Sequence, residues 1–335
     1  SGFTAMWTRP SEEAPRGQQG GLRIAVCVVG QLSRLEIASK VEHVLKPTWE
    51  QPHKPEALDV FLALERGGYF FSNIDNGAIH AQQHPGCREE LPHAEVRRRL
   101  APWLAAVEYK AHVTREVNLS LWKRYRRERP AEERSTRLQH HLSQFAHMRT
   151  CAQLVQRFEV GARRHYDLIL KMRDNTIAVS PLALSQQHLT DRCWSKGCIE
   201  WKGYNDKVML IPRVHMDGAL RSVAEDFFLT PRLGRGVPNS ERLLKKVLDN
   251  NLVKVQRVTA EQLPLVDGRC TARGWCLVEE GKDCRPATWS WAARPCEEIE
   301  MTPGQKCLFE HRFLARRIVA QKCGGATNGI AMNEA

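Results

Sequence analysis

Three common signatures are missing from this chain of 335 residues, and each absence narrows what the protein can be. No two of its eleven cysteines have the C-x-x-C spacing of a zinc ribbon, which argues against a structural metal site. No run of about 18 apolar residues occurs, so we expect none of these residues to span a membrane. The G-x-G-x-x-G sequence of a dinucleotide-binding turn is also absent, so the sequence does not predict that kind of cofactor site.

Acidic residues are fewer than basic residues in this chain. Fifty Lys and Arg residues stand against 38 Asp and Glu residues, which gives a net charge of +12. A basic surface attracts anions such as nucleic acids, acidic lipids, polyanionic glycans and nucleoside diphosphates. The basic residues gather at 97–99 and 123–127, but no nucleic-acid-binding motif accompanies either cluster. We therefore interpret both clusters as solvated helix faces and do not expect nucleic acid as a partner.

The apolar content of 42% is typical of a globular protein, and the chain is long enough for one large domain with an appendage. Residues 1–21 are rich in Pro, Gly and Gln and predict a flexible lead-in. Because Ser1-Gly2 resembles a cleavage scar, we expect any membrane attachment to come from an anchor upstream of this chain. The expected domain covers residues 22–262, and a cysteine-rich segment covers 263–335.

The cysteines predict an oxidising compartment. Six lie in the last third, among Gly, Pro and Trp, and predict disulfides: Cys270, Cys276, Cys284, Cys296, Cys307 and Cys323. Cys193 and Cys198 bracket a short turn and could form a further bridge. Cys27 and Cys151 lie in apolar patterns, where we expect free cysteines that pack as small hydrophobic residues. With the glycosylation acceptor sequence at 118–120, these features favour the lumen of the secretory pathway.

Strand and helix patterns alternate along the chain, which predicts an α/β fold. The continuous apolar run at 22–29 is typical of a central parallel strand, and 57–64 predicts a second strand. Apolar residues recur at steps of three and four from 138 to 159, which predicts a long amphipathic helix. Further strands are expected from residue 166, at 208–212 and at 252–258.

The most informative polar break follows the strand that starts at Tyr166. Here Arg173, Asp174 and Asn175 come directly after a buried apolar run. In open α/β sheets the carboxyl ends of the strands are where ligands bind. Carboxylate and amide oxygens are ligands of Mg²⁺ and Mn²⁺, which commonly hold a diphosphate. The segment therefore suggests a nucleotide-sugar site, although a strand that ends in a polar turn explains it too.

Two other turns carry candidate binding residues. After the first strand, Gly30 and Gln31 permit a close approach to the backbone, and Arg34 could pair with a phosphate. Before the strand at 208–212, the triplet Asn205-Asp206-Lys207 places amide, acid and ammonium groups together, or forms an ordinary turn.

A helix is expected to begin at Asn239 or Ser240, either of which is a good N-cap. Glu241 then lies in the first turn, where the helix dipole favours a carboxylate. Helix capping and a catalytic role explain this acid equally well.

Taken in order, these features resemble the GT-A class of glycosyltransferases, in a branch found in algae, other protists and bacteria. The resemblance covers residues 22–258. The segments that carry it are Val29-Gly30-Gln31-Leu32-Ser33-Arg34, Asp59-Val60-Phe61, a helix with Gln144, Cys151 and Glu159, Tyr166-Asp167 with its strand end, Gly203-Tyr204-Asn205-Asp206-Lys207, and Asn239-Ser240-Glu241. The class implies a mixed, mainly parallel sheet flanked by helices, with the cysteine-rich segment as an appendage outside it.

The resemblance implies a nucleoside-diphosphate sugar as donor and a glycan or glycoprotein as acceptor, in the Golgi lumen. The implied donor site contains Gly30, Gln31, Arg34, Asp59, Arg173, Asp174, Asn175, Asn205, Asp206 and Lys207. Asp174 and Asn175 would hold Mn²⁺ or Mg²⁺. This chain departs from the Asp-x-Asp motif of the class there, so Arg173 and Arg34 could instead neutralise the diphosphate.

In an inverting enzyme of this class an acid at the start of a later helix serves as base, and Glu241 and Asp226 are the two candidates. A retaining mechanism would not need that base. Two alternatives stay open: a catalytically inactive GT-A-fold subunit that binds or scaffolds, and a polyanion-binding module that depends on the net charge.

Overall fold

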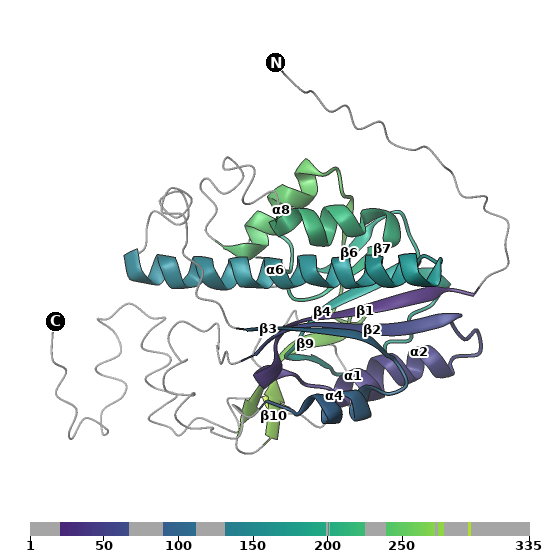
Figure 1. The fold of residues 1–335 in the computed structure, drawn as a ribbon. Helices are drawn as coiled ribbons and strands as arrows, with labels where there is room; N and C mark the ends of the chain where they lie inside the picture. The colour runs from purple at the N-terminus through teal and green to yellow at the C-terminus, as the bar shows by residue number, and fades with distance from the viewer. Residues whose placement is uncertain are drawn as a thin grey trace.

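The computed structural model describes residues 21–66, 90–111, 131–198, 200, 202–224, 239–271, 274–277 and 294–295. Within these ranges a seven-stranded sheet carries helices on both faces (Figure 1). The predicted lead-in and most of the cysteine-rich segment lie outside the described residues.

The large sheet has the strand order β3-β2-β1-β4-β7-β6-β8. In that order the strands are Leu104–Ala111, Ala57–Arg66, Arg23–Gln31, Leu168–Arg173, Met209–Pro212, Cys193–Lys196 and Val255–Val258. β1 pairs in parallel with β2 and β4, and β2 pairs in parallel with β3. β7 is antiparallel to both of its neighbours, β4 and β6, whereas β6 and β8 are parallel to each other. This mostly parallel mixed sheet confirms the predicted α/β class.

β1 lies in the interior of the sheet, between β2 and β4, because its side chains are apolar on both sides. Ala25, Cys27 and Val29 belong to the core on one face, while alternate residues of the same strand belong to the core on the other face. A strand covered on both faces in this way needs a continuous apolar sequence, which is the pattern at 22–29.

The helices form two layers. α6 (Ala131–Ala162) and α8 (Ser240–Asn250) cover one face, and α1 (Ala38–Lys40), α2 (Lys46–Glu50) and α4 (His93–Leu100) cover the other (Figure 1). Buried residues of α6 at 142, 145, 148, 152 and 155 repeat at helical spacing, which confirms the predicted amphipathic helix. Among the described residues, no helix combines the length and the apolar character needed to cross a membrane.

A smaller sheet joins the start of the predicted cysteine-rich segment to the domain. Its order is β11-β10-β9-β5, with β11 at Arg294–Pro295, β10 at Gly274–Leu277, β9 at Leu265–Thr271 and β5 at Thr176–Ala178. β9 is antiparallel to β5, which comes directly after the polar break that ends β4. Leu263 and Leu265, beyond the predicted boundary at 262, are buried in the main core.

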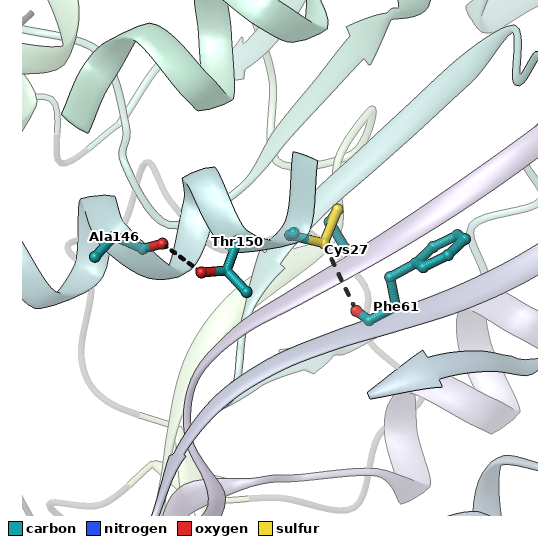
Figure 2. The surroundings of a disulfide bond; sticks show 5 residues. Cys27, Phe61, Ala146 and Thr150 are labelled. Atoms are coloured by element: carbon teal, nitrogen blue, oxygen red, sulfur yellow. Dashed lines mark hydrogen bonds between the residues drawn. A yellow bond between two sulfur atoms is a disulfide. The ribbon is translucent and has the colours of Figure 1, made fainter. Parts of the chain in front are cut away.

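The expectation that Cys27 and Cys151 are free is wrong. The two form a disulfide that joins β1 to α6, with their Cα atoms 6.0 Å apart (Figure 2). Both cysteines occupy inward-facing positions, which the sequence pattern shows, but only the packing of α6 on β1 brings them together. Cys198 is disulfide-bonded, whereas Cys193 is free and buried, so the structure does not form the suggested Cys193–Cys198 bridge.

Candidate functional site

The strand order of the sheet reverses between β1 and β4. From β1 it adds β2 and then β3 on one side, and it returns to place β4 on the other side of β1. In open α/β sheets the crevice at such a reversal, outside the carboxyl ends of the strands, is the usual ligand site. The register pairs Val29 with Arg173, so the end of β1 and the polar break after β4 lie side by side.

Asp174 fixes the turn after β1 to the end of β4. Its Oδ2 accepts hydrogen bonds from the Gln31 backbone N–H and from Arg34 Nε, both at 2.8 Å, and its Oδ1 accepts from Arg34 Nη2 at 3.0 Å. A glycine is required at position 30, which has a φ of +142° and where a Cβ would lie 2.4 Å from the Asp174 carboxylate carbon. Four of the predicted donor-site residues therefore meet here.

The same arrangement bears on the predicted Mn²⁺ or Mg²⁺ at Asp174 and Asn175. Asp174 is fully buried, and both of its oxygens already accept hydrogen bonds, mostly from the Arg34 guanidinium. A metal ion could use this carboxylate only if Arg34 moved away, because the cation and the guanidinium compete for the same lone pairs. With Arg34 in this position, the oxygens of the pair do not fit a metal ion.

Arg173 points into a second group of charges beside the first. Its Nη2 donates to Gln144 Oε1 at 3.2 Å, and Gln144 Nε2 donates to Asp206 Oδ2 at 2.7 Å. Burial by itself raises the pKa of Asp206, but Arg173 and Lys171 outweigh it and hold that pKa below its usual range. Burial lowers the pKa of Arg173, and the attraction of Asp206 and Asp267 outweighs it, so the guanidinium stays charged.

Lys171 stabilises the turn at Asn205, Asp206 and Lys207. Its buried ammonium donates to the backbone carbonyls of Asp206 and of Lys207, the latter at 3.2 Å. Burial lowers its pKa to about 7, and neighbouring carboxylates oppose that change only in part. Asn205 stabilises the same turn, because its Oδ1 accepts from the Lys207 backbone N–H at 2.9 Å and its Nδ2 donates to Cys198 O at 3.0 Å.

Glu241 approaches this group from the start of α8. Burial raises its pKa to about 7, and the nearby Asp206 carboxylate adds to the effect. Its helix is capped by Asn239, whose side chain accepts from the Arg242 backbone N–H at 2.9 Å. Since Asn239 provides the cap, Glu241 is not needed as the N-cap acceptor, and a carboxyl group that titrates near neutral pH is available for proton transfer.

Two residues of this candidate site were not predicted from the sequence. Lys171 reads as a strand residue, and only its burial at the site edge reveals its role. Asp267 comes from β9, in the segment assigned to the appendage, and its Oδ2 pairs with Lys207 Nζ at 2.7 Å. The position of this acid directly after the apolar residues Leu265 and Val266 is the one signal that could have identified it.

Asp59 is not brought to this edge. It is the third residue of a ten-residue strand, pairs in register with Ala25, and accepts a hydrogen bond from Tyr166 Oη at 2.8 Å near the amino end of β2. The carboxyl end of β2 is instead at Glu65, which lies beside Gln31. The rival catalytic candidate, Asp226, lies outside the described residues.

Comparisons with known proteins add no assignment to this geometry: no family model matches the chain, and no curated protein matches it.

Proposed function

We propose that the protein is a GT-A-type glycosyltransferase, which transfers a sugar from a nucleoside-diphosphate sugar to a hydroxyl of a glycan or glycoprotein. The observation that supports this most is the group of Arg173, Lys171, Lys207, Asp206 and Glu241 at the reversal of the sheet. Arg173 and Lys207 are cations that can meet a diphosphate, Lys171 holds the turn that carries Lys207, and Glu241 is an acid that titrates near pH 7. Such cations and such an acid are the two requirements of this reaction.

The sheet agrees with this proposal. One antiparallel strand, β7, is inserted beside β4, and the polar break after β4 leads directly into a smaller sheet. The mixed, mainly parallel sheet that the resemblance implies has this general form. Disulfides at Cys27, Cys151, Cys198 and Cys276 agree with an oxidising lumen, and we infer the Golgi as the compartment.

In the proposed mechanism the departing diphosphate lies against the carboxyl ends of β1 and β4. Arg173 and Lys207 stabilise the negative charge that grows on the leaving group, because both are held at this edge by neighbouring carboxylates. Gln144 orients the Arg173 guanidinium through its carbonyl oxygen. Lys171 holds the Asn205–Lys207 turn in place.

If the enzyme inverts the anomeric centre, Glu241 takes the proton from the acceptor hydroxyl. A base with a pKa of about 7 is ionised in a useful fraction at neutral pH and still binds a proton well. Asp226 is the alternative base. A retaining mechanism uses neither.

A second candidate function has one observation in its favour. Because Arg34 occupies both oxygens of Asp174, the acid that follows β4 performs a structural task. A GT-A-type subunit that binds a glycan or a nucleotide without turnover would need no more than this. The +12 net charge keeps a polyanion-binding module as a third candidate.

Nucleotide release separates these candidates. The purified protein, with an acceptor mixture and with Mn²⁺, Mg²⁺ or EDTA, is expected to release UDP or GDP from at least one donor of a broad panel. Arg173→Gln should reduce that turnover by roughly 100-fold or more. The matched control is Arg164→Gln, which removes an exposed arginine paired with Glu56 away from the site and should leave turnover unchanged. No release from any donor, together with salt-sensitive heparin binding, would reject the enzyme in favour of the polyanion module.

A further inference from the structure

Asp267 has one carboxylate oxygen in use and one without a partner. Oδ2 pairs with Lys207 Nζ at 2.7 Å, whereas Oδ1 is buried and has no hydrogen-bond partner in the part of the chain that the structure describes. The residue is only 8% exposed. A buried acceptor without a donor is costly, and native proteins rarely tolerate one unless a ligand or an ordered water supplies the hydrogen.

Asn175, which lies close to Asp267, also has a side-chain oxygen without a hydrogen-bond partner among the described residues. Its backbone oxygen accepts from the Gly268 N–H at 2.8 Å, and its Nδ2 donates to the Gly268 oxygen at 3.0 Å, so it lies against the residue that follows Asp267. Its Oδ1 is buried and also has no partner among the described residues, and the residue is 7% exposed.

The Oδ1 atoms of Asn175 and Asp267 occur in the same part of the fold. Among the described residues, the buried side-chain oxygens without a partner are those of Asn175 and Asp267, and both lie where β5 meets β9. β5 begins directly after the strand end that carries Arg173, so these oxygens flank the cationic group of the site. They offer acceptors where Arg173 and Lys207 offer donors.

We propose that Asp267 and Asn175 form a subsite that accepts hydrogen bonds from hydroxyl groups of the donor sugar. The inference rests on the proposed function and deepens it. A carboxylate repels a diphosphate, so the anionic part of the donor binds Arg173 and Lys207, and the neutral polyol part binds the two free acceptors. Arg173 and Lys207 also outweigh the effect of burial on Asp267 and lower its pKa, which keeps it an ionised acceptor at neutral pH.

The test compares the binding of a nucleoside diphosphate with that of its sugar conjugates. Dissociation constants for UDP, UDP-glucose, UDP-N-acetylglucosamine, GDP and GDP-mannose are measured by calorimetry on the whole chain. For wild type, at least one sugar conjugate should bind more tightly than its free nucleotide. Asp267→Asn should lose roughly tenfold or more of the preference for the sugar, because a neutral amide accepts a hydrogen bond more weakly than a carboxylate does. The preference is taken as the ratio of the two constants, since the change also removes the charge paired with Lys207 and so affects the free nucleotide.

Asn175→Ala removes the other acceptor, leaves the Asp267–Lys207 pair in place and should reduce the same preference. Asp249→Asn is the matched control: it alters an exposed acid paired with Lys245 and should change neither constant. If both site variants keep the wild-type preference, or if wild type shows none, the subsite is rejected while nucleotide binding still stands. If wild type binds neither UDP nor GDP, the proposed function falls and the subsite falls with it.

Discussion

Arg34 holds both carboxylate oxygens of Asp174, through Nε at 2.8 Å and Nη2 at 3.0 Å, in a pair that is almost completely buried. The pair locks the turn after β1 onto the end of β4, at the point where the sheet reverses. Asp174 is therefore a structural anchor of the site, and in the proposed function Arg173 and Lys207 are the cations that meet the ligand.

Arg34→Met should destabilise the protein strongly, because it leaves the Asp174 carboxylate buried without its cationic partner, although the Gln31 N–H still donates to it. Loss of one member of a buried pair typically costs about 3–5 kcal/mol of unfolding free energy. Urea unfolding measures the cost. Lys245→Met, which breaks an exposed pair with Asp249, is the control and should cost less than about 1 kcal/mol. Equal effects of the two variants would contradict the anchoring role.

Gly30→Ala should also be destabilising, by roughly 1–3 kcal/mol, since the added Cβ would meet the Asp174 carboxylate in a left-handed backbone conformation. The matched control is Gly161→Ala in α6, where an added Cβ meets nothing within 4 Å. That change should stabilise the protein by about 0.5–1 kcal/mol, because alanine favours a helix more than glycine does. If the Gly30 contact is as described, thermal unfolding should show a lower Tm than wild type for Gly30→Ala and a higher Tm for Gly161→Ala.

Glu241→Gln should change how stability depends on pH. The folded pKa of Glu241 is raised from 4.5 to about 7, so between these values the folded state keeps a proton that the unfolded state has lost. Wild-type stability from this group is therefore full below pH 4.5 and falls as the pH rises to about 7. Glutamine has no such penalty, so the variant should gain up to about 3 kcal/mol relative to wild type between pH 4.5 and 8. Chemical unfolding at pH 4.5 and pH 8 measures that difference, and a constant difference would contradict the raised pKa.

The same residue predicts a pH profile for turnover. If Glu241 is the base, kcat/KM should rise with pH through about 7, where the carboxyl group ionises. Glu241→Gln should lower kcat by roughly 10²–10⁴-fold and remove this rise. A variant that keeps the wild-type profile would assign the base elsewhere, and Asp226 is the next residue to test.

Removal of the Cys27–Cys151 disulfide should lower the unfolding free energy by about 2–5 kcal/mol, since it joins the central strand to the long helix. The variant is Cys27→Ala with Cys151→Ala. Cys193→Ala is the control, because Cys193 is a free buried cysteine and its loss removes only a small volume. If the double variant costs no more than the Cys193→Ala control, the disulfide does not form in the folded protein.

The sequence predicts the fold class well because apolar patterns decide it. The continuous run of β1 and the helical spacing of α6 both require burial, and the structure buries them as expected. β3 was missed, because Leu104–Ala111 alternates too weakly to be distinguished from a loop. Asp59 was assigned to the donor site for a different reason. The sequence places it near the start of the predicted strand at 57–64, as the structure does, and only the family resemblance counted it among the donor-site residues.

The candidate site was predicted in part. Gly30, Arg34 and Asp174 were found because they interrupt apolar runs, and the structure brings them together. Their roles could not be predicted, since the pairing of Arg34 with Asp174 depends on how β1 and β4 align. Asp267 lies in β9, 93 positions after Asp174 in the sequence, and no local sequence pattern links the two residues.

The central claim is that a nucleoside-diphosphate sugar binds at the carboxyl ends of β1 and β4. The most direct measurement is a crystal structure of the protein with bound UDP, or with GDP if calorimetry favours it. We expect the diphosphate to lie against Arg173 and Lys207, next to Asp206 and within reach of Glu241. A nucleotide bound at another edge of the sheet, with these residues as they are without ligand, would contradict it.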